Sequence, residues 1–148
     1  RKTMPGLRLA QKYAVHVGGA TNHRLGLYDG ILIKENHIAA AGGVAAALRG
    51  ARALQSGVVI QIEVETLAQL QIAVASGATD ILLDNFTPAQ MREAVAVSAG
   101  RARLEVSGGV DLARVREIAA TGVDRISIGR LTKDVIAVDY SMRVFAVL

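Results

Sequence analysis

The sequence predicts an α/β fold in which parallel strands alternate with helices and form an incomplete barrel. Three observations predict this fold: short aliphatic segments recur along the chain, helix start and stop signals separate them, and the segments are aliphatic on one face only. The 148 residues provide about five or six βα units, whereas a complete TIM-like (β/α) barrel needs roughly 200 or more residues.

Five short segments have the aliphatic and β-branched composition of buried strands. These are residues 30–34, 58–65, 80–85, 102–107 and 124–129. The intervening segments are long enough to hold a helix, so we expect βαβ units and a parallel sheet.

Helix signals lie between the later strands. Each predicted helix opens at a Thr or Asp that can cap it and closes at a glycine, and the pairs are Thr66 and Gly77, Thr87 and Gly100, and Asp111 and Gly122. Pro88 follows Thr87 at the first helical position, which proline favours. The alanine-rich segment 41–55 is also compatible with a helix.

Side-chain parity decides between a barrel and an open doubly wound sheet, because alternate residues of a strand point to opposite faces. One face is wholly aliphatic and consists of Ile31, Ile33, Ile60, Ile62, Val64, Ile81, Leu83, Leu104, Val106, Ile126 and Ile128. The other is mostly polar and consists of Leu32, Lys34, Val59, Gln61, Glu63, Glu65, Asp80, Leu82, Asp84, Arg103, Glu105, Ser107, Arg125, Ser127 and Gly129. A doubly wound sheet would be apolar on both faces, and an antiparallel sheet with one wet face would not place capped helices between its strands. We therefore predict a barrel whose polar interior receives a ligand at the mouth.

The composition fits one α/β domain with a substantial core. Hydrophobic residues make up 51% of the chain and aromatic residues 3%, and the absence of cysteine excludes disulfides and cysteine metal sites. No apolar run reaches the roughly 20 residues of a membrane helix and no signal peptide is recognisable, so we expect a cytoplasmic protein. Because the first residue is Arg1 and not Met, we interpret the chain as the interior of a longer one.

Positive charge is concentrated in residues 1–37. Six Lys and Arg against two acidic residues there account for the whole formal charge of +4 (six minus two), and all three histidines lie there too. This concentration predicts a small anionic ligand or an acidic partner surface, with a solvated basic face as the alternative. Nucleic acid is not expected, because runs of Lys or Arg and stacking aromatic residues are lacking.

Barrel active sites lie at the carboxyl ends of the strands, where the sequence places Lys34, Glu63 (or Glu65) and Asp84. Lys34 could bind a carboxylate or phosphate as a point charge, or pair with one of the acidic neighbours. Glu63 and Asp84 could bind sugar hydroxyls, hold Mg²⁺ or stabilise a cationic transition state. The alternative is an interior salt-bridge network, which desolvation makes costly.

Two glycine-containing loops follow the last two strands. Ser107, Gly108 and Gly109 precede a predicted helix, and Gly129 and Arg130 follow the next strand. Backbone N–H groups near a helix N-terminus bind anions, and barrel phosphate sites often use two late loops. Together the loops predict a phosphate site.

Three histidines and an arginine complete the set of candidates. His23 and Arg24 precede the first strand, where arginine offers a bidentate fork to a carboxylate. His16 has the features of an ordinary surface or core histidine, and the role of His37, in a loop after Lys34, stays open. No two histidines have i, i+4 spacing on a helix, so a histidine metal site is not expected.

Six segments occur in an order that resembles the quinolinate phosphoribosyltransferases, also called carboxylating nicotinate-nucleotide pyrophosphorylases. They are RKTMPGLR, GGATNHRLGLYDGILIKENHI, IEVET, ILLDNF, EVSGGV and ISIGRLT. The resemblance extends over essentially all 148 residues, and NHRLGLYDGILIKENHI is its most specific part; Met4 is a minor departure. It implies that residues 1–148 are the C-terminal portion of an α/β-barrel catalytic domain, without the N-terminal domain and the first barrel strand.

The resemblance also implies an activity and a set of site residues. Phosphoribosyl pyrophosphate and quinolinate would react with Mg²⁺ to give nicotinate mononucleotide, pyrophosphate and CO₂, in the de novo route to NAD. The implied substrate-binding residues are Arg1, Lys2, Thr3, His23, Arg24 and Lys34 at the carboxylate end, Glu63 and Asp84 at the ribose, and Ser107, Gly108, Gly109, Ile128, Gly129 and Arg130 at the phosphate end. Lys34, Glu63 and Asp84 would be catalytic, and the two carboxylates would face Mg²⁺.

The resemblance implies a dimer in which the N-terminal domain of a partner subunit adds an arginine to each site, so the isolated chain could be inactive. Two alternatives remain. One is a related barrel phosphoribosyltransferase of the molybdenum-uptake-associated type, and the other is a non-catalytic anion-binding barrel fragment. The segment LIKENHI favours the quinolinate enzyme.

Overall fold

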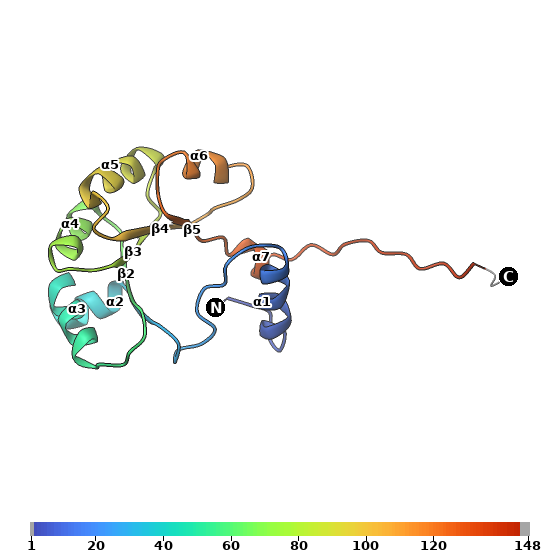
Figure 1. The fold of residues 1–148 in the computed structure, drawn as a ribbon, viewed down its shortest axis with the longest axis horizontal. Coiled ribbons are helices and arrows are strands. Elements are labelled where there is room, and N and C mark those ends of the chain that lie inside the picture. Colours follow the sequence, from blue (N-terminus) through green and yellow to red (C-terminus); the bar gives the residue numbers. More distant parts are fainter. Residues whose placement is uncertain (1, 146–148) are drawn as a thin grey trace.

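The protein forms a curved sheet of five parallel strands with helices along its outer side (Figure 1). A computed structural model describes residues 2–145. The strands are β1 (Ile31–Ile33), β2 (Ile60–Val64), β3 (Asp80–Asp84), β4 (Arg103–Ser107) and β5 (Arg125–Ile126). Their spatial order is the chain order, and each pairs in parallel with the next. The predicted α/β class and the incomplete parallel barrel are confirmed.

Within the described residues 2–145, seven helices connect and flank the strands. They are α1 (Arg8–Val17), α2 (Glu35–Ala41), α3 (Val44–Ala53), α4 (Leu67–Ala75), α5 (Pro88–Ser98), α6 (Val115–Ala119) and α7 (Arg130–Lys133). Helices α2 to α6 lie along the outer side of the curved sheet, whereas α1 and α7 lie together beyond its inner side (Figure 1). Among residues 2–145, no helix combines the length and the apolar character that crossing a membrane requires.

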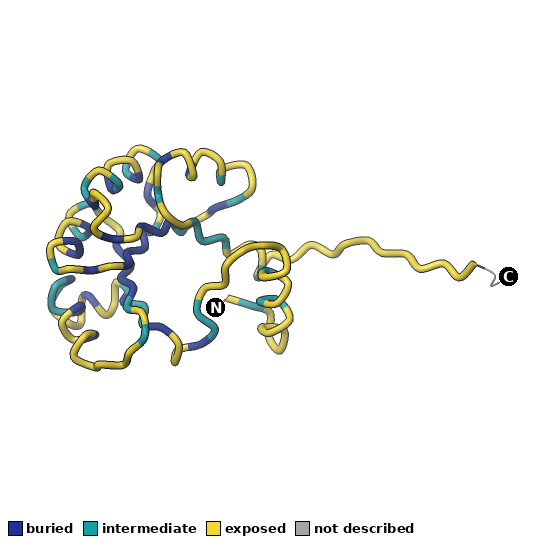
Figure 2. Tube along the Cα trace, viewed as in Figure 1, coloured by how far each residue is buried: buried dark blue, intermediate teal, exposed yellow. Residues whose placement is uncertain are grey.

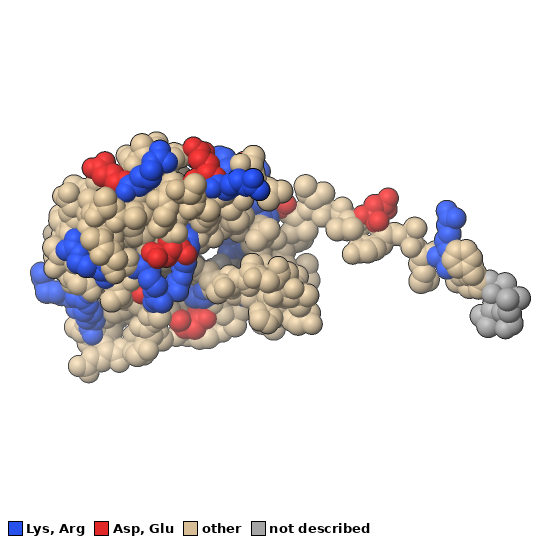
Figure 3. All heavy atoms as spheres, turned by 45° about the horizontal axis from the view of Figure 1, so that its top comes forward, with Lys and Arg blue, Asp and Glu red and all other residues tan. Residues whose placement is uncertain are grey.

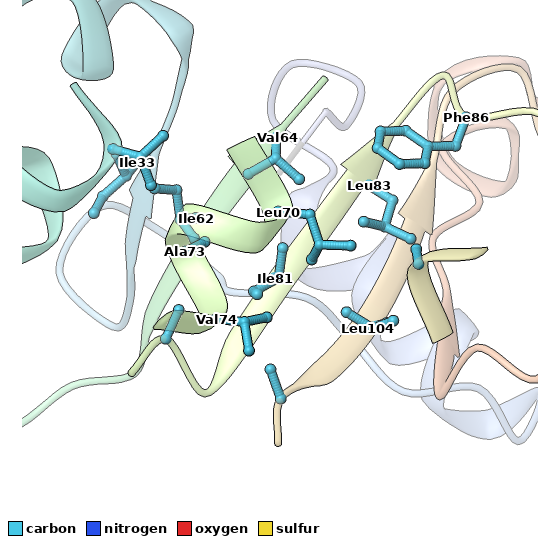
Figure 4. Close-up of a cluster of buried hydrophobic side chains, with 14 of the residues drawn as sticks. Ile33, Ile62, Val64, Leu70, Ala73, Val74, Ile81, Leu83, Phe86 and Leu104 are labelled. Carbon is cyan, nitrogen blue, oxygen red and sulfur yellow. The ribbon is translucent and has the colours of Figure 1, made fainter. Parts of the chain in front are cut away.

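The aliphatic face of the sheet packs against the outer helices, as parity predicts (Figure 2). The strand residues Ile62, Val64, Ile81, Leu83, Leu104 and Val106 are at most 2% exposed. Each of four successive helices adds one nearly inaccessible anchor: Leu48, Leu70, Met91 and Ile118. Figure 4 shows Leu70 and Val74 of α4 directed at Ile62, Ile81 and Leu83 of the sheet. Full burial of one such side chain contributes about 1.5–3 kcal/mol, so these anchors fix the helices to the sheet.

Two of the predicted caps have the expected geometry. The hydroxyl of Thr66 accepts the N–H of Gln69 at 3.2 Å, and that of Thr87 accepts the N–H of Gln90 at 3.3 Å. Asp111 makes the bonds of a cap, although the helix after it starts later than predicted: the N–H of Val115 donates to the carbonyl of Asp111 at 3.0 Å. Its carboxylate accepts the N–H of Arg114, which closes a turn, and α6 begins only at Val115.

Three helical segments differ from the predictions. The alanine-rich segment 41–55, which is compatible with a helix, holds α3, and α3 begins only after Gly42 and Gly43, whose φ angles are +82° and +130°. Helix α2, which ends before these glycines, was not predicted. Helices α1 and α7 were not predicted. Strand β5 is shorter than the predicted 124–129, although the N–H of Ser127 still bonds to the carbonyl of Val106 at 2.8 Å.

Candidate active site at the carboxyl ends of the strands

The polar strand-end residues lie together on the inner side of the sheet. Lys34 follows β1, Glu63 is on β2, and Asp84 and Ser107 end β3 and β4 as paired positions of the ladder. Glu63 is 8% exposed although it points away from the aliphatic core. The structure therefore brings together Lys34, Glu63, Asp84 and Ser107, all of which the sequence had placed at strand ends.

Lys34 and Glu63 form an ion pair, with 2.8 Å between Nζ and Oε1. The hydrogen bond to Glu63 raises the pKa of Lys34 above its usual 10.5, partial burial opposes this shift, and Asp84 adds a smaller attraction. The pairing that the sequence offered as an alternative thus exists, and it holds a cation beside two carboxylates. The lysine side chain is 45% exposed, so a ligand can reach its ammonium group.

The raised pKa of Lys34 predicts a loss of stability in alkali. Its contribution is complete below about pH 10.5, where Lys34 is charged in both folded and unfolded chains, and disappears as the pH rises through the higher folded-state pKa. The thermal midpoint of the wild type should therefore fall more than that of Lys34→Met between about pH 10 and 12. Parallel curves for the two proteins would contradict the prediction.

Helix α2 begins directly at the end of β1, because Lys34 also serves as its N-terminal boundary. The N–H of Lys34 donates to Nδ1 of His37 at 3.0 Å, which is the bond that a capping box makes from the N-cap backbone to the side chain three residues later. His37 therefore lies in α2 and not in a loop as predicted. It supports the backbone at Lys34 from one helical turn away.

Asp84 is held by two neighbours. The hydroxyl of Ser107 donates to Oδ1 at 2.6 Å, and the amide of Asn85 donates to Oδ2 at 2.8 Å. Asn85 has a left-handed backbone with φ of +58°, and its N–H bonds to the carbonyl of Ser107 at 3.0 Å. Sequence reasoning missed Asn85, although an asparagine directly after a strand is a signal for this conformation.

Gly108 is needed where the loop after β4 passes Asn85. Its φ is +98°, and a Cβ built there would lie 2.8 Å from Asn85 Cγ and 3.0 Å from its backbone nitrogen. Gly109 also has a positive φ, of +57°. A hydrogen-bonded turn at residues 111–114 lies between this loop and the first residue of α6.

Arg24 and His23 are each held by a side-chain contact near β1, Arg24 by the residue before β1 and His23 by a residue of β2. One guanidinium nitrogen of Arg24 donates to the carbonyl of Gly30 at 2.6 Å. Asp29 closes the intervening loop by accepting the N–H groups of Leu25 and Gly26, and these bonds keep the pKa of Asp29 below its usual value. His23 Nε2 lies 3.1 Å from the side-chain oxygen of Gln61 on β2. His16 is exposed on α1, as expected of an ordinary surface histidine.

The N-terminal segment lies beside helix α7, which follows β5. The carbonyl of Lys2 accepts the hydroxyl of Thr132 at 2.7 Å, and Gln11 donates to the carbonyl of Thr132 at 2.9 Å. Thr3 accepts from Nε of Arg8 at 3.2 Å. Two distant parts of the sequence, each carrying predicted site residues, are thus joined.

The remaining candidates have more varied surroundings. Gly129 begins α7 and accepts the N–H groups of Thr132 and Lys133, Ile128 packs partly buried against the core, and Arg130 faces Asp134 at 3.5 Å. Glu65 is exposed beyond β2, which separates it from Glu63. Arg1 lies outside the described residues.

The donor set suits Mg²⁺ only in combination with a substrate. Within residues 2–145, no cluster of three or more His, Asp or Glu side chains could hold a metal ion. Mg²⁺ is commonly bound by one or two carboxylates together with water and substrate phosphates, which is the number that Glu63 and Asp84 provide. The chemistry of these two residues therefore fits a metal that arrives with a phosphorylated ligand.

Charge on the outer surface is mixed. Figure 3 shows Lys and Arg side chains interspersed with Asp and Glu over the helices. At the amino ends of the strands, Arg103 and Arg125 lie 2.8 Å and 3.6 Å from the buried carboxylate of Asp80. This ion-pair cluster is at the opposite end of the sheet from Lys34 and Asp84.

A sequence model described as "Quinolinate phosphoribosyl transferase, C-terminal domain" matches residues 1–143. A probable carboxylating nicotinate-nucleotide pyrophosphorylase of Bacillus subtilis is 46% identical over 145 residues, which are 97% of this chain and 50% of the relative. The corresponding Mycobacterium leprae protein is 47% identical, covering 96% of this chain and 51% of its own. The chain thus spans about half the length of these curated relatives.

Solved structures of proteins with related names are also similar to this chain. The nicotinate-nucleotide pyrophosphorylase of Francisella tularensis has a TM-score of 0.87 and 51% identity, covering 90% of this chain and 48% of its own. NadC of Streptococcus pyogenes has a TM-score of 0.92 and 43% identity, covering 97% and 51%. A thiamine phosphate pyrophosphorylase of Pyrococcus furiosus, at 18% identity and a TM-score of 0.56, shares the fold alone.

Proposed function

The chain belongs to the quinolinate phosphoribosyl transferase family, and from this premise we propose that it is the catalytic barrel portion of a decarboxylating quinolinate phosphoribosyltransferase. Its reaction would join quinolinate to phosphoribosyl pyrophosphate and yield nicotinate mononucleotide, pyrophosphate and CO₂. The observation that supports the proposal most directly is the Lys34–Glu63 pair beside Asp84 at adjacent strand ends. It offers a cation for a carboxylate and anions for a developing ribosyl cation.

The cationic side of the site suits quinolinate, which is a dianion. Lys34 and Arg24 provide full positive charges, and Arg24 is aimed by its bond to the carbonyl of Gly30. In the proposed complex the quinolinate carboxylates would contact these groups, together with Arg1 and Lys2. Charge-assisted hydrogen bonds of this kind are about twice as strong as neutral ones, so they would fix the orientation of the ring.

The carboxylates suit the ribosyl transfer. The ring nitrogen of quinolinate would form the new bond to the ribose carbon while the bond from that carbon to pyrophosphate breaks and pyrophosphate leaves with the electron pair. Positive charge develops on the ribose in this step, and Glu63 and Asp84 would stabilise it. Mg²⁺, when bound with the substrate, would neutralise phosphate charge beside these carboxylates.

Decarboxylation would follow at the ring carbon next to the nitrogen. The bond from that carbon to its carboxylate breaks, CO₂ leaves, and the electron pair stays on the ring carbon until it takes a proton. Lys34 and Arg24 would stabilise this carbanion electrostatically. The same cations would thus serve binding first and the second step afterwards.

We also propose that the working protein is a homodimer or a larger oligomer, in which the N-terminal part of a partner subunit completes the site. The chain spans about half of its relatives, which supports testing the chain both alone and extended. The predicted cytoplasmic location stays a prediction.

The proposal predicts product from quinolinate and none from nicotinate. The test uses the chain alone and a chimaera that adds the part of the Bacillus subtilis relative outside the match, each with phosphoribosyl pyrophosphate and Mg²⁺. Nicotinate mononucleotide and released CO₂ are measured. Binding of both substrates to the chimaera without turnover would favour the non-catalytic alternative, and turnover of a different acceptor would favour the molybdenum-associated type.

A further inference from the structure

A chain of buried and partly buried hydrogen bonds crosses the inner side of the sheet and ends at His23. The side-chain nitrogen of Gln61 donates to Oε2 of Glu105 at 2.8 Å, and the hydroxyl of Ser127 donates to the other carboxylate oxygen. The side-chain oxygen of Gln61 lies 3.1 Å from Nε2 of His23. Gln61 and Glu105 are only 7% and 6% exposed, which shields the bond between them from water, whereas the side chain of His23 is 35% exposed.

The chemistry of the groups fixes which of them donates and which accepts in each of these hydrogen bonds. A carboxylate can only accept, so Glu105 requires the NH₂ of Gln61 and leaves the carbonyl of that amide to face His23. A carbonyl can also only accept, so Nε2 of His23 must carry a hydrogen. The orientation of Gln61 therefore follows from Glu105 and does not depend on which way its amide is assigned.

The other ring nitrogen of His23 has the opposite role. The N–H of Arg24 donates to Nδ1 at 2.9 Å, so Nδ1 must present a lone pair. A doubly protonated ring would lose this bond. Glu105 lies 3.9 Å from Nε2, beyond hydrogen-bond reach, so it acts on the ring through Gln61.

We propose that Gln61 and Glu105 are positioning residues that hold His23 as the neutral Nε2–H tautomer, with its ring fixed at the carboxylate-binding end of the site. The functional consequence rests on the proposed function. It is that Lys34 and Arg24 supply the positive charge for the substrate, while His23, whose Nε2–H is held by Gln61 and whose Nδ1 is held by Arg24, contributes an uncharged ring in a fixed orientation. Fixing a binding group before the ligand arrives reduces the entropy lost on binding.

The first test is ¹⁵N NMR of the histidine rings near neutral pH. We expect a protonated Nε2 and an unprotonated Nδ1 for His23, with the Nε2 hydrogen observable because Gln61 protects it from exchange. The signal is assigned by its loss in His23→Gln. An imidazolium ring or the Nδ1–H tautomer in the wild type would overturn the proposal, whatever the activity of the protein.

Three variants test whether Gln61 and Glu105 orient the ring of His23 or only occupy space in the interior. Gln61→Met and Glu105→Met should each lose the observable Nε2 hydrogen. Glu105→Gln should retain it, because its carbonyl can accept from Gln61 while its NH₂ donates to the rotated hydroxyl of Ser127. The same substitution at exposed Gln71 on α4, Gln71→Met, is the control. Loss of the signal in Glu105→Gln, with the fold intact, would contradict orientation as the mechanism.

The second readout is kinetic and uses the turnover-competent form. KM for quinolinate should rise about fivefold to tenfold in the two Met variants with kcat little changed, and Glu105→Gln should restore it, since each Met variant removes about one hydrogen bond that fixes the ring for binding. Absence of turnover in the wild type with the expected NMR result would count against the proposed function and leave the tautomer assignment standing. Unchanged KM in Gln61→Met, once its Nε2 hydrogen is lost, would overturn the positioning role.

Discussion

Replacing Lys34 by Ala is expected to lower kcat/KM for quinolinate by about 100-fold or more, because the site loses the cation that faces both the substrate carboxylate and Glu63. Steady-state kinetics of the turnover-competent form measure this loss. Arg92→Ala is the control, since it also removes one positive charge but lies exposed on α5 at the outer side of the sheet. Unchanged turnover in Lys34→Ala would remove Lys34 from the site.

A second variant separates loss of chemistry from loss of fold. Lys34→Ala leaves Glu63, whose side chain is 10% exposed, without its cation, which lowers stability. The double variant Lys34→Ala/Glu63→Gln removes that isolated charge. We expect the thermal midpoint of the double variant to recover. Turnover of Lys34→Ala itself is compared with that of the wild type at a temperature where both are folded, because Glu63→Gln removes a proposed catalytic carboxylate. Equal turnover under these conditions would mean that Lys34 acts through stability alone.

Gly108→Ala is expected to lower the free energy of unfolding by about 2–3 kcal/mol and turnover by about tenfold or more, measured by denaturation and by kinetics. The added Cβ would meet Asn85, which holds one oxygen of Asp84. Displacing Asn85 therefore disturbs a proposed catalytic carboxylate as well as the loop.

The control for Gly108→Ala is Gly122→Ala. Gly122 has a similar φ of +90°, but the atom nearest to a built Cβ is Val95 Cγ1 at an ordinary 3.6 Å. It should therefore cost only the left-handed backbone strain, about 1–2 kcal/mol, and leave turnover unchanged. Equal losses of stability and turnover in the two variants would show that the contact with Asn85 has no special effect.

Sequence analysis predicted the parts of the fold that depend on residues close together in the chain. Alternation along each strand identified the face that packs against the helices. A threonine at the start of a helical segment identified the caps Thr66 and Thr87. Helix α2 was missed because its first turn uses Lys34 and His37, a pair outside the usual capping residues. Helix α1 was missed because Leu7 precedes it without a side-chain cap, although Leu9, Tyr13 and Val17 repeat at helical spacing.

The candidate site also has a part that sequence analysis could place and a part that it could not. Lys34, Glu63, Asp84 and Ser107 could be placed from sequence because each ends a recognisable strand or follows one. Their partners could not be placed, because partnership depends on which side chains meet across the sheet. Gln61 and Glu105 are 44 residues apart, and both were recognised as polar-face residues without any sign that they touch.

The agreement between chain order and strand order has a consequence for how the protein folds. Each strand pairs with the next one along the chain, and paired residues such as Asp80 and Arg103 are only 23 positions apart. Each such separation is the length of one helical crossover, so the entropy of closing the loop is modest and similar from strand to strand. The sheet can therefore grow outward from a central pair such as β2 and β3, one strand and helix at a time, and each addition leaves the register of the earlier strands unchanged.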